Sequence, residues 1–551
     1  MFSVEPPAPR LIIKVLRSKV RGRGVAAVRE SREPDVLTFK VLVDGKAPPK
    51  LDPDGMYLVS QEGQPIRARF QYAAETGLLF CDRRSQGLAA LSLPWPVRGG
   101  SHVMLRTALV PDREAPYLLT MELARGRIAD LWRKRDEWGY IYGGPSNAVA
   151  KGLADAKLLL AQAETVQDMP LAASDLAEEA ISRSFALGEQ LALEDAAHGI
   201  GLRRRQGQLA RVDFGCHWEP ADRHERMQQR FAAAFNYATV PLVWRMIEPR
   251  EHEYAWKWHD DWIQWLEAKG IAIKGGSLVR FNQAHLPDWI WIWENDFETV
   301  RDLVFDRIEQ CVRRYRGRVD CWDAVTGLHV ENAMEFSLDR IIEVTRICCH
   351  AVKRTDPAAL VALDIVQPWG EYYAVNQRSI WPYHYAEMCL NAGAVFDAIG
   401  LQVLIGSGAA GHHVRDMLEL SDLLDRFGGL GKPIHLTAVG VPSAFTADPA
   451  AALGGAAHAV GAGGVWHKPW DETVQAEWAN DFYRVAISKP YVQAITWRDF
   501  ADPQAHEVPH GGLLRKDLHP KIAYQRLMAL RQEIWPQAAG ADEGNIFFPE
   551  A

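Results

Sequence analysis

Residues 431–440 read Gly431-Lys432-Pro433-Ile434-His435-Leu436-Thr437-Ala438-Val439-Gly440, and this segment is typical of one repeating unit of the chain. Apolar and β-branched residues bounded by Gly and Pro predict a short, buried strand. Seven more segments of this kind lie between residues 210 and 500, and amphipathic helical stretches separate them. Eight strands that alternate with helices predict a parallel (β/α)8 barrel, also called a TIM barrel.

The boundaries of these elements follow from the same patterns. We expect the barrel strands at 210–216, 237–246, 271–279, 320–325, 359–365, 398–405, 433–439 and 494–500. Among the helices between them, we expect 300–315, 338–353, 414–427 and 473–488. Because a TIM barrel carries its chemistry at the carboxyl ends of its strands, candidate site residues are sought there.

Two further regions precede the barrel. Residues 1–125 read as an all-β, sandwich-like domain, because short β-rich runs such as 35–45 and 102–108 are separated by Gly, Pro and Asp. Residues 126–205 are rich in Ala, Leu and Glu and predict a helical connector, and residues 206–540 form the predicted barrel domain. A carbohydrate-binding module and a purely structural domain are both open for the first region.

Composition excludes several classes of function. The 551 residues are 48% hydrophobic and 24% charged, with a net charge of −8, which argues against a nucleic-acid-binding protein. No run of 18 apolar residues is present, so we expect no membrane span. Residues 1–25 lack the apolar core of a signal peptide, and we expect a cytoplasmic protein. The sequence does not predict the oligomeric state.

Cysteine and histidine spacing gives no metal site. The seven cysteines lack ligand spacing and predict buried free thiols. We interpret His412-His413 as part of a solvent-facing loop and Arg203-Arg204-Arg205 as a solvated linker. We therefore expect neither a metal nor a cofactor.

Several motifs, in order, carry a resemblance to a known family. They are Phe235-Asn236-Tyr237-Ala238, Lys274-Gly275-Gly276, Trp322-Asp323, Ile399-Gly400-Leu401-Gln402, Gly431 to Thr437, and Ala494 to Phe500. Together they resemble glycoside hydrolase family 10, the xylanase family, over roughly the last 330 residues. The resemblance implies a TIM barrel that acts on an oligo- or polysaccharide.

The resemblance also implies where the catalytic carboxylates belong. The family has a Glu as general acid/base at the end of the fourth strand and a Glu as nucleophile on the seventh. In this chain those positions read Gly327 and Ala438. A retaining glycosidase needs two carboxyl groups about 5–5.5 Å apart, and neither residue supplies one. The sequence therefore predicts an impaired or redirected activity.

Sugar-binding positions differ as well. Where the family has a His and a Trp near the third strand, this chain has Gly276 and Arg280. Leu404 replaces the family's His two residues after Gln402, and Arg498 replaces the Trp of the eighth strand.

Other residues near the strand ends are candidate replacements. Glu331 follows the fourth strand, Glu371 follows the fifth and Asp499 follows the eighth, so each is a substitute carboxylate. As an alternative, Glu331 begins the next helix and serves only the helix dipole. The candidate saccharide contacts are Gln402, Trp289, Trp291, Trp497, Arg498, Arg280 and His329.

Three hypotheses follow. The protein is a non-catalytic relative that binds a carbohydrate or protein partner, an O-glycosyl hydrolase with a relocated acid and base, or a scaffold in which the barrel is structural. Binding of oligosaccharides separates the first from the third, and turnover separates the second from both.

Overall fold

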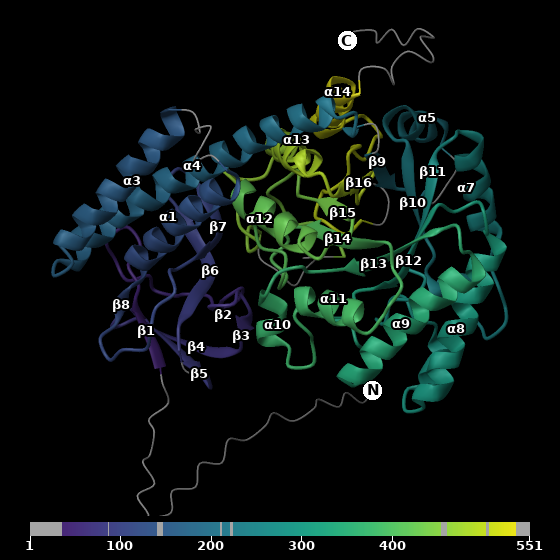
Figure 1. Ribbon diagram of the computed structural model, residues 1–551, viewed down its shortest axis with the longest axis horizontal. Coiled ribbons are helices and arrows are strands. Elements are labelled where there is room, and N and C mark those ends of the chain that lie inside the picture. The colour runs from purple at the N-terminus through teal and green to yellow at the C-terminus, as the bar shows by residue number, and fades with distance from the viewer. Residues whose placement is uncertain are drawn as a thin grey trace, which may run out of the picture.

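The computed structural model describes residues 36–85, 87–139, 147–209, 212–220, 224–452, 460–502 and 506–535. The remaining residues, among them the first 35 of the predicted N-terminal domain and the last five of the predicted barrel domain, lie outside the described ranges. Figure 1 shows a β-rich part and a larger barrel side by side, with long helices lying across one side of both.

The β-rich part contains two four-stranded sheets, with strand orders β4-β5-β1-β8 and β3-β2-β6-β7. Its strands are β1 Val36–Lys40, β2 Tyr57–Ser60, β3 Pro65–Ile66, β4 Ala68–Ala73, β5 Leu78–Arg83, β6 Ala89–Val97, β7 Ser101–Arg106 and β8 Tyr117–Leu118. Alternation places one face of each sheet inward, as in β1, where Leu37 and Phe39 are fully buried. Buried residues of both sheets belong to one apolar cluster.

Helices follow these sheets directly. They are α1 Leu119–Glu137, α3 Asn147–Thr165 and α4 Pro170–Arg205. Helix α4 contacts α1 and α3 and also α12 and α13 of the barrel. It spans the β-rich part and the barrel in Figure 1, so it connects the two by packing as well as by sequence.

Eight parallel strands close into a barrel, which confirms the predicted fold. The strands are β9 Asp213–His217, β10 Tyr237–Pro241, β11 Ala272–Gly276, β12 Cys321–Thr326, β13 Leu360–Ile365, β14 Ala398–Leu404, β15 Ile434–Gly440 and β16 Val492–Trp497. Most strand residues are buried because one face packs inside the barrel and the other packs under the helices. The predicted second strand is too long: it ends at Pro241, and α6 begins at Trp244.

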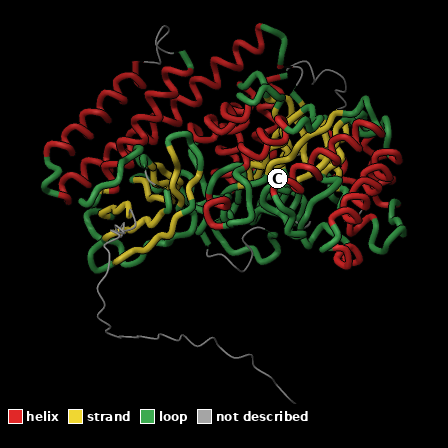
Figure 2. The backbone as a smooth tube through the Cα atoms, turned by 60° about the horizontal axis from the view of Figure 1, so that its bottom comes forward, coloured by secondary structure: helices red, strands yellow, loops and turns green. Residues whose placement is uncertain are grey.

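Helices surround the strands, as the red helical segments around the yellow strands of the barrel show in Figure 2. They are α5 Glu225–Ala234, α6 Trp244–Ile247, α7 Lys257–Ala268, the 3₁₀ helix η2 Asp288–Trp293, α8 Phe297–Arg314, α9 Leu338–Thr355, α10 Glu371–Val375, α11 Pro382–Asn391, α12 Met417–Gly428, α13 Glu472–Ser488 and α14 Ile522–Ile534. All seven cysteines are buried free thiols, as predicted. Within the described residues, no helix is long and apolar enough to cross a membrane.

The β-rich part is attached to loops at the carboxyl ends of the barrel strands. The backbone of His102 exchanges two hydrogen bonds of 2.8 Å with Val465, and Met104 N–H donates to the Val414 carbonyl at 2.9 Å. Arg67 donates to backbone carbonyls of the segment after α10, among them that of Gln377 at 3.1 Å. Strand β7 lies at the edge of its sheet, and the backbone contacts of His102 and Met104 with barrel loops cover this edge.

The interpretation of residues 203–205 as a solvated linker is wrong, because these residues form the last turn of α4. Arg203 is only 4% exposed, and its guanidinium Nη1 donates to the carbonyls of Ile487 and Lys489 at 2.7 Å each. A buried guanidinium therefore fixes the end of α4 to the segment between α13 and β16.

We predict that Arg203→Met lowers the free energy of unfolding by about 2–4 kcal/mol, because it leaves buried carbonyls without donors. Arg205→Met is the matched control, since Arg205 is exposed in the same turn, and its expected change stays within about 0.5 kcal/mol. Urea-induced unfolding measures both. Equal effects of the two substitutions would contradict the role of Arg203.

Candidate functional site

A small polar cavity, which we call the mouth, lies at the carboxyl ends of the barrel strands. The residues that line it are His217, Glu219, Thr239, Pro241, Leu242, Val243, Gly276, Ser277, Arg280, His285, Asp323, Asp364, Gln402, Thr437, Arg498 and Glu507. Its free volume is about 40 Å³, room for a few water molecules. The mouth is therefore lined by many polar and charged groups and contains little free space.

Arg498, directly after β16, is the centre of the first ion-pair group. Its Nη1 contacts Glu219 Oε1 at 2.5 Å, and its Nη2 contacts Glu507 Oε1 at 3.3 Å. The same Nη1 lies 3.1 Å from Nδ1 of His217, whose Nε2 lies 2.9 Å from the Thr437 carbonyl oxygen. One guanidinium thus joins the segments that follow the first and last strands of the barrel.

Arg280 forms the second group. Its Nε and Nη2 donate to the two oxygens of Glu331 at 2.6 Å each, a bidentate pair. Asn282 Nδ2 also donates to Glu331 at 2.9 Å. Arg280 Nη1 lies 4.0 Å from Glu507 Oε1, so Glu507 lies between the two arginines.

These pairs hold two glutamates ionised. Burial alone would raise the pKa of Glu219, but the charge of Arg498 outweighs it, and the pKa falls to about 2. Burial likewise opposes ionisation of Glu507, and Arg498 and Arg280 together lower its pKa to about 2. Neither carboxyl carries a proton at neutral pH, so neither serves there as a general acid.

A second polar layer lies deeper. Asp364 accepts from Gln402 Nε2 at 2.7 Å and from Thr437 Oγ1 at 2.5 Å. Lys274 Nζ lies 2.8 Å from Asp323 Oδ1, and both side chains are almost completely buried. Burial raises the pKa of Asp323 to about 7, although the charge of Lys274 opposes the shift. Lys274 is therefore ion-paired with Asp323, a carboxyl group of the mouth whose pKa lies near neutrality.

The structure places both positions that the resemblance marked as catalytic at this end of the barrel. Gly327 has φ +66°, and a Cβ added to it would lie 2.9 Å from Val366 Cγ2 and 3.6 Å from Glu331 Cδ. Any other residue there would be strained and crowded. Ala438 is 1% exposed and packs with Leu404 and Val508 in an apolar cluster.

Glu331 contacts Arg280 but does not itself line the cavity, and three other predicted residues also lie away from the lining. Glu371 begins α10, where its carboxylate contacts Arg415 at 2.6 Å in a buried pair. Asp499 is buried and accepts the backbone N–H groups of Glu507 and Val508 at 2.9 and 3.0 Å, so it positions the segment that carries Glu507. His329 is fully buried, with Nε2 2.9 Å from the Val366 carbonyl oxygen.

The three predicted tryptophan contacts do not line the mouth either. Trp497 is fully buried and donates to the Gly511 carbonyl at 3.0 Å. Trp289 donates to the Glu248 carbonyl at 3.0 Å, and Trp291 is partly buried against the core. Of the predicted saccharide contacts, the structure brings only Gln402, Arg280 and Arg498 to the cavity.

The expectation of a solvent-facing loop at His412-His413 is wrong. The two side chains are 6% and 3% exposed, because the β-rich part covers this loop. His412 Nδ1 lies 2.7 Å from the Leu404 carbonyl oxygen, and His413 Nδ1 lies 3.4 Å from Glu371. Within the described ranges, no group of three or more His, Cys, Asp or Glu side chains is arranged to hold a metal ion.

Sequence reasoning gave no signal for His285 and Glu507, which line the mouth. Glu219 and Asp364 stand at strand ends, and position alone marks them in a TIM barrel. His285 and Glu507 lie in long loops, where position along the sequence carries no such signal. Their approach to Arg280 and Arg498 depends on the folded loops.

Comparison with known proteins identifies the family. The model of "Glycosyl hydrolase family 10" matches residues 207–530, more than half of the chain. The chain belongs to glycosyl hydrolase family 10. This match covers the barrel and leaves the β-rich part and helices α1 to α4 outside it.

Curated relatives are similar over part of the chain. "Endo-1,4-beta-xylanase B" of Paenibacillus barcinonensis is 26% identical over 235 residues, which are 39% of this chain and 66% of that protein. "Endo-1,4-beta-xylanase B" of Thermotoga neapolitana is 24% identical over 270 residues, which are 47% of this chain and 68% of that protein. The chain thus spans about two thirds of the length of these two relatives.

Two solved xylanase structures align with part of the chain. Native xylanase 10B from Thermotoga maritima aligns with 61% of this chain and 99% of its own, with a TM-score of 0.46 and 20% sequence identity. Xylanase 10B from Thermotoga petrophila RKU-1, solved in complex with xylobiose, aligns with 60% and 98%, with a TM-score of 0.46 and 21% identity.

We predict that Arg498→Gln lowers the free energy of unfolding at pH 7 by about 1–3 kcal/mol, because it leaves the partly buried carboxylate of Glu219 without its guanidinium partner and Glu507 with Arg280 alone. The wild-type contribution is complete above about pH 4.5, the ordinary pKa, and is lost as the pH falls toward the folded pKa of about 2. In the variant, Arg498 no longer offsets the burial of either carboxyl, so both pKa values rise relative to wild type, and acid protonates Glu219 first and relieves the defect. The difference from wild type therefore shrinks between pH 7 and pH 3.

Urea-induced unfolding at both pH values measures this difference. Arg515→Gln is the matched control, because Arg515 pairs with Glu472 at 2.7 Å while 47% exposed, and exposed pairs contribute about 0–1 kcal/mol. A deficit of the Arg498 variant that is equal at pH 7 and pH 3 would contradict the ionised state of Glu219 and Glu507.

Proposed function

We propose that this protein is a catalytically impaired member of glycosyl hydrolase family 10 whose barrel mouth binds a short saccharide without cleaving it efficiently. One observation carries the proposal: Glu219, Glu331 and Glu507 are each bound to a guanidinium. Hydrolysis with retention needs one carboxyl group that donates a proton and one carboxylate that attacks. The ion pairs hold Glu219 and Glu507 ionised, which argues against a proton donor, and the guanidinium groups bind carboxylate oxygens that a nucleophile needs free.

The positions of Gly327 and Ala438 support the same proposal. A nucleophile on β15 needs an open approach to the anomeric carbon, and Ala438 instead faces Leu404 and Val508. An acid at the end of β12 needs a side chain, and Gly327 has a backbone conformation that other residues rarely adopt. The surroundings of both positions therefore leave little room for a carboxylate side chain.

Saccharide binding rests on the polar groups that remain. Gln402, His285 and Arg280 face the cavity and supply donors and acceptors for sugar hydroxyl groups. The free volume of about 40 Å³ does not admit a sugar ring. Binding of a sugar ring therefore requires lining side chains such as that of Glu507 to move, and this cost predicts weak affinity.

A second function has one observation in its favour. The carboxyl carbon of Glu331 lies 3.6 Å from the point where a side chain at Gly327 would begin. Glu331 thus reaches the region of the family's acid position from a different place in the chain. Under this second proposal the protein is an active hydrolase in which Glu331 replaces the missing acid/base and Glu507 attacks.

We predict that the purified protein binds xylotriose with a Kd in the millimolar range and releases no detectable product from it or from xylan. Loss of acid/base assistance alone costs about 10²–10⁴-fold in rate, before loss of the nucleophile is counted. Calorimetry and chromatography of the products measure binding and turnover. Robust hydrolysis would overturn the proposed impairment, and no binding at high concentrations of the sugar would leave the barrel a scaffold.

Glu331→Gln tests the second proposal directly. If hydrolysis is detected, relocation of the acid/base to Glu331 predicts a loss of about 10²–10⁴-fold in kcat/KM in this variant. Glu335→Gln is the matched control, because Glu335 lies four residues further along the same loop and is 65% exposed. Full activity of Glu331→Gln would remove the second proposal.

We also predict that Gly327→Glu combined with Ala438→Glu does not restore strong hydrolysis. The first substitution meets a positive φ and Val366, and the second adds a charge beside Leu404 and Val508. Misplacement of a reacting group by about 1 Å costs about 10²-fold. Turnover of an activated aryl xyloside near that of an ordinary family member would contradict this expectation.

A further inference from the structure

The loop between β15 and α13 is attached to the β-rich part at one short segment. Val465 exchanges two backbone hydrogen bonds of 2.8 Å with His102 of β7, and His467 N–H donates to Ser101 Oγ at 3.0 Å. A Cβ added to Gly100 would lie 2.7 Å from the His467 carbonyl oxygen, so the two segments approach each other closely. Residues 465–467 therefore form the attachment.

Glu189 of α4 binds the side chains of the same segment. It is 6% exposed, and its Oε1 accepts a hydrogen bond of 2.6 Å from Trp466 Nε1, while its Oε2 contacts His467 Nε2. Within the described residues, His467 carries the only basic group that lies within 4.0 Å of this carboxylate. The imidazole is 49% exposed, so it exchanges protons with solvent. The charge that compensates a buried carboxylate is therefore a titratable one.

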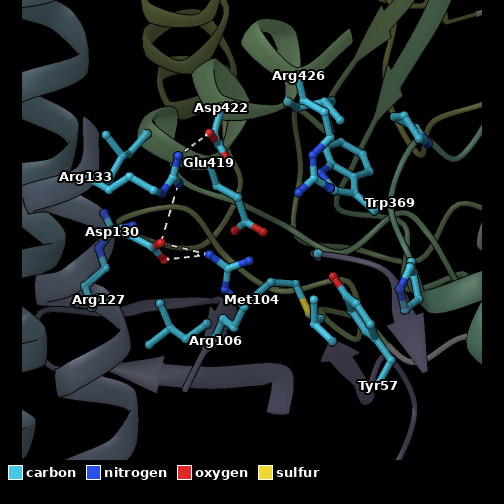
Figure 3. Close-up of a pocket in the computed structure, with 18 of the residues that line it drawn as sticks. Tyr57, Met104, Arg106, Arg127, Asp130, Arg133, Trp369, Glu419, Asp422 and Arg426 are labelled. Atoms are coloured by element: carbon cyan, nitrogen blue, oxygen red, sulfur yellow. Dashed lines mark hydrogen bonds and ion pairs between the residues drawn. The ribbon is translucent and has the colours of Figure 1, made fainter. Parts of the chain in front are cut away.

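Other ion pairs at this junction use permanently charged groups. Arg106 contacts Asp130 at 2.8 Å and Arg133 contacts Asp422 at 3.1 Å, around the pocket between the β-rich part and the barrel that Figure 3 shows. A guanidinium stays protonated throughout the physiological pH range, whereas an imidazole titrates near neutrality. The contact of His467 with Glu189 is thus of a different kind.

Carboxylates on two helices favour a protonated His467. Partial burial lowers its pKa, but the hydrogen bond and the charge of Glu189 outweigh burial, and the charges of Asp481 and Glu477 of α13 act in the same direction. The pKa of His467 is therefore raised above its ordinary value of 6.5. Asp481 is also influenced by the charge of Arg484 on the same helix.

The other cations near the contact have carboxylate partners of their own. Lys468, the next residue of the loop, lies 4.0 Å from Asp471. Arg127 of α1 is ion-paired with Asp416, which caps the N-terminus of α12. When His467 loses its proton, neither Lys468 nor Arg127 lies within ion-pair distance of Glu189 to replace its charge.

The same loop borders the mouth in its earlier part. Ala452 N–H donates to the His506 carbonyl at 3.0 Å, and Ser443 Oγ donates to the His510 carbonyl at 2.7 Å. The segment of these two histidines also carries Glu507 of the cavity lining. The loop thus contacts the β-rich part near one end and the mouth near the other.

We propose that His467 and Glu189 form a pH-sensitive switch, which holds the loop between β15 and α13 against α4 and β7 and weakens this attachment as the medium becomes alkaline. The stabilisation is complete below about pH 6.5, the ordinary pKa of histidine, and is lost as the pH rises through the raised pKa of the folded protein. The proposal is independent of the function of the mouth, because neither residue lines that cavity.

Hydrogen–deuterium exchange of the full-length protein at about pH 6 and about pH 8.5 tests the switch. The reporters are the amides of Val465 and His467, whose hydrogen bonds with β7 form the attachment. We expect their protection factors to fall by about 5- to 10-fold between the two pH values, since a hydrogen bond with a charged partner is about twice as strong as a neutral one. Amides of β12, in the barrel, are the internal reference for changes in global stability.

Two variants assign the effect to the pair. In His467→Gln and in Glu189→Gln, we expect the Val465 amide to be less protected than in wild type at about pH 6, and to show no further loss relative to β12 at about pH 8.5. His198→Gln is the matched control, because His198 is an exposed histidine of the same helix α4. This control is expected to keep the pH dependence of the wild type.

Two results would overturn the proposal. One is a wild-type protection of Val465 and His467 that, relative to β12, does not fall between the two pH values. The other is an undiminished fall at Val465 in either His467→Gln or Glu189→Gln, which would assign the pH response to another group.

Discussion

The contact of Arg498 with Glu219 and Glu507 determines the chemistry of the barrel mouth. It joins the segment after the first strand to the segment after the eighth, at 2.5 and 3.3 Å. Arg280 extends it through Glu507 to Glu331, so carboxylates from three different segments share two guanidinium groups. Buried charges need partners of this kind, and a carboxylate that is fully paired is neither a proton donor nor a free nucleophile.

The attachment of the β-rich part imposes a second constraint. Strand β7 binds the loops after β14 and β15 through backbone hydrogen bonds, and Arg67 binds the segment after α10. These loops lie at the carboxyl ends of the barrel strands, where a TIM barrel exposes its site. One side of this face is therefore covered by protein, and the charged pocket of Figure 3 lies at that junction.

The sequence predicted the barrel well because the spacing of apolar residues and the Gly and Pro residues at strand ends are local features of the chain. All eight predicted strands overlap observed ones, and the second was too long because Val243 and Trp244 continue the apolar pattern into a helical turn. The residues of the candidate site were harder to predict from the sequence. Arg280, Arg498 and Gln402 were selected through the resemblance to the family, but the placement of His285 and Glu507 depends on loop folding. Burial of Arg203 and His413 depends on packing between distant segments, which periodicity does not encode.

The most direct test of the central claim asks whether any carboxylate at the mouth attacks a sugar. A dinitrophenyl xylobioside fluorinated at carbon two needs no acid assistance, and a competent nucleophile becomes covalently glycosylated by it. Intact-mass spectrometry of the protein after incubation measures the adduct. Because the arginines hold Glu219, Glu331 and Glu507 in ion pairs, we predict an unchanged mass. A gain of one fluoroglycosyl group, mapped to any of these three residues or to Asp323 or Asp364 of the cavity lining, would contradict the account.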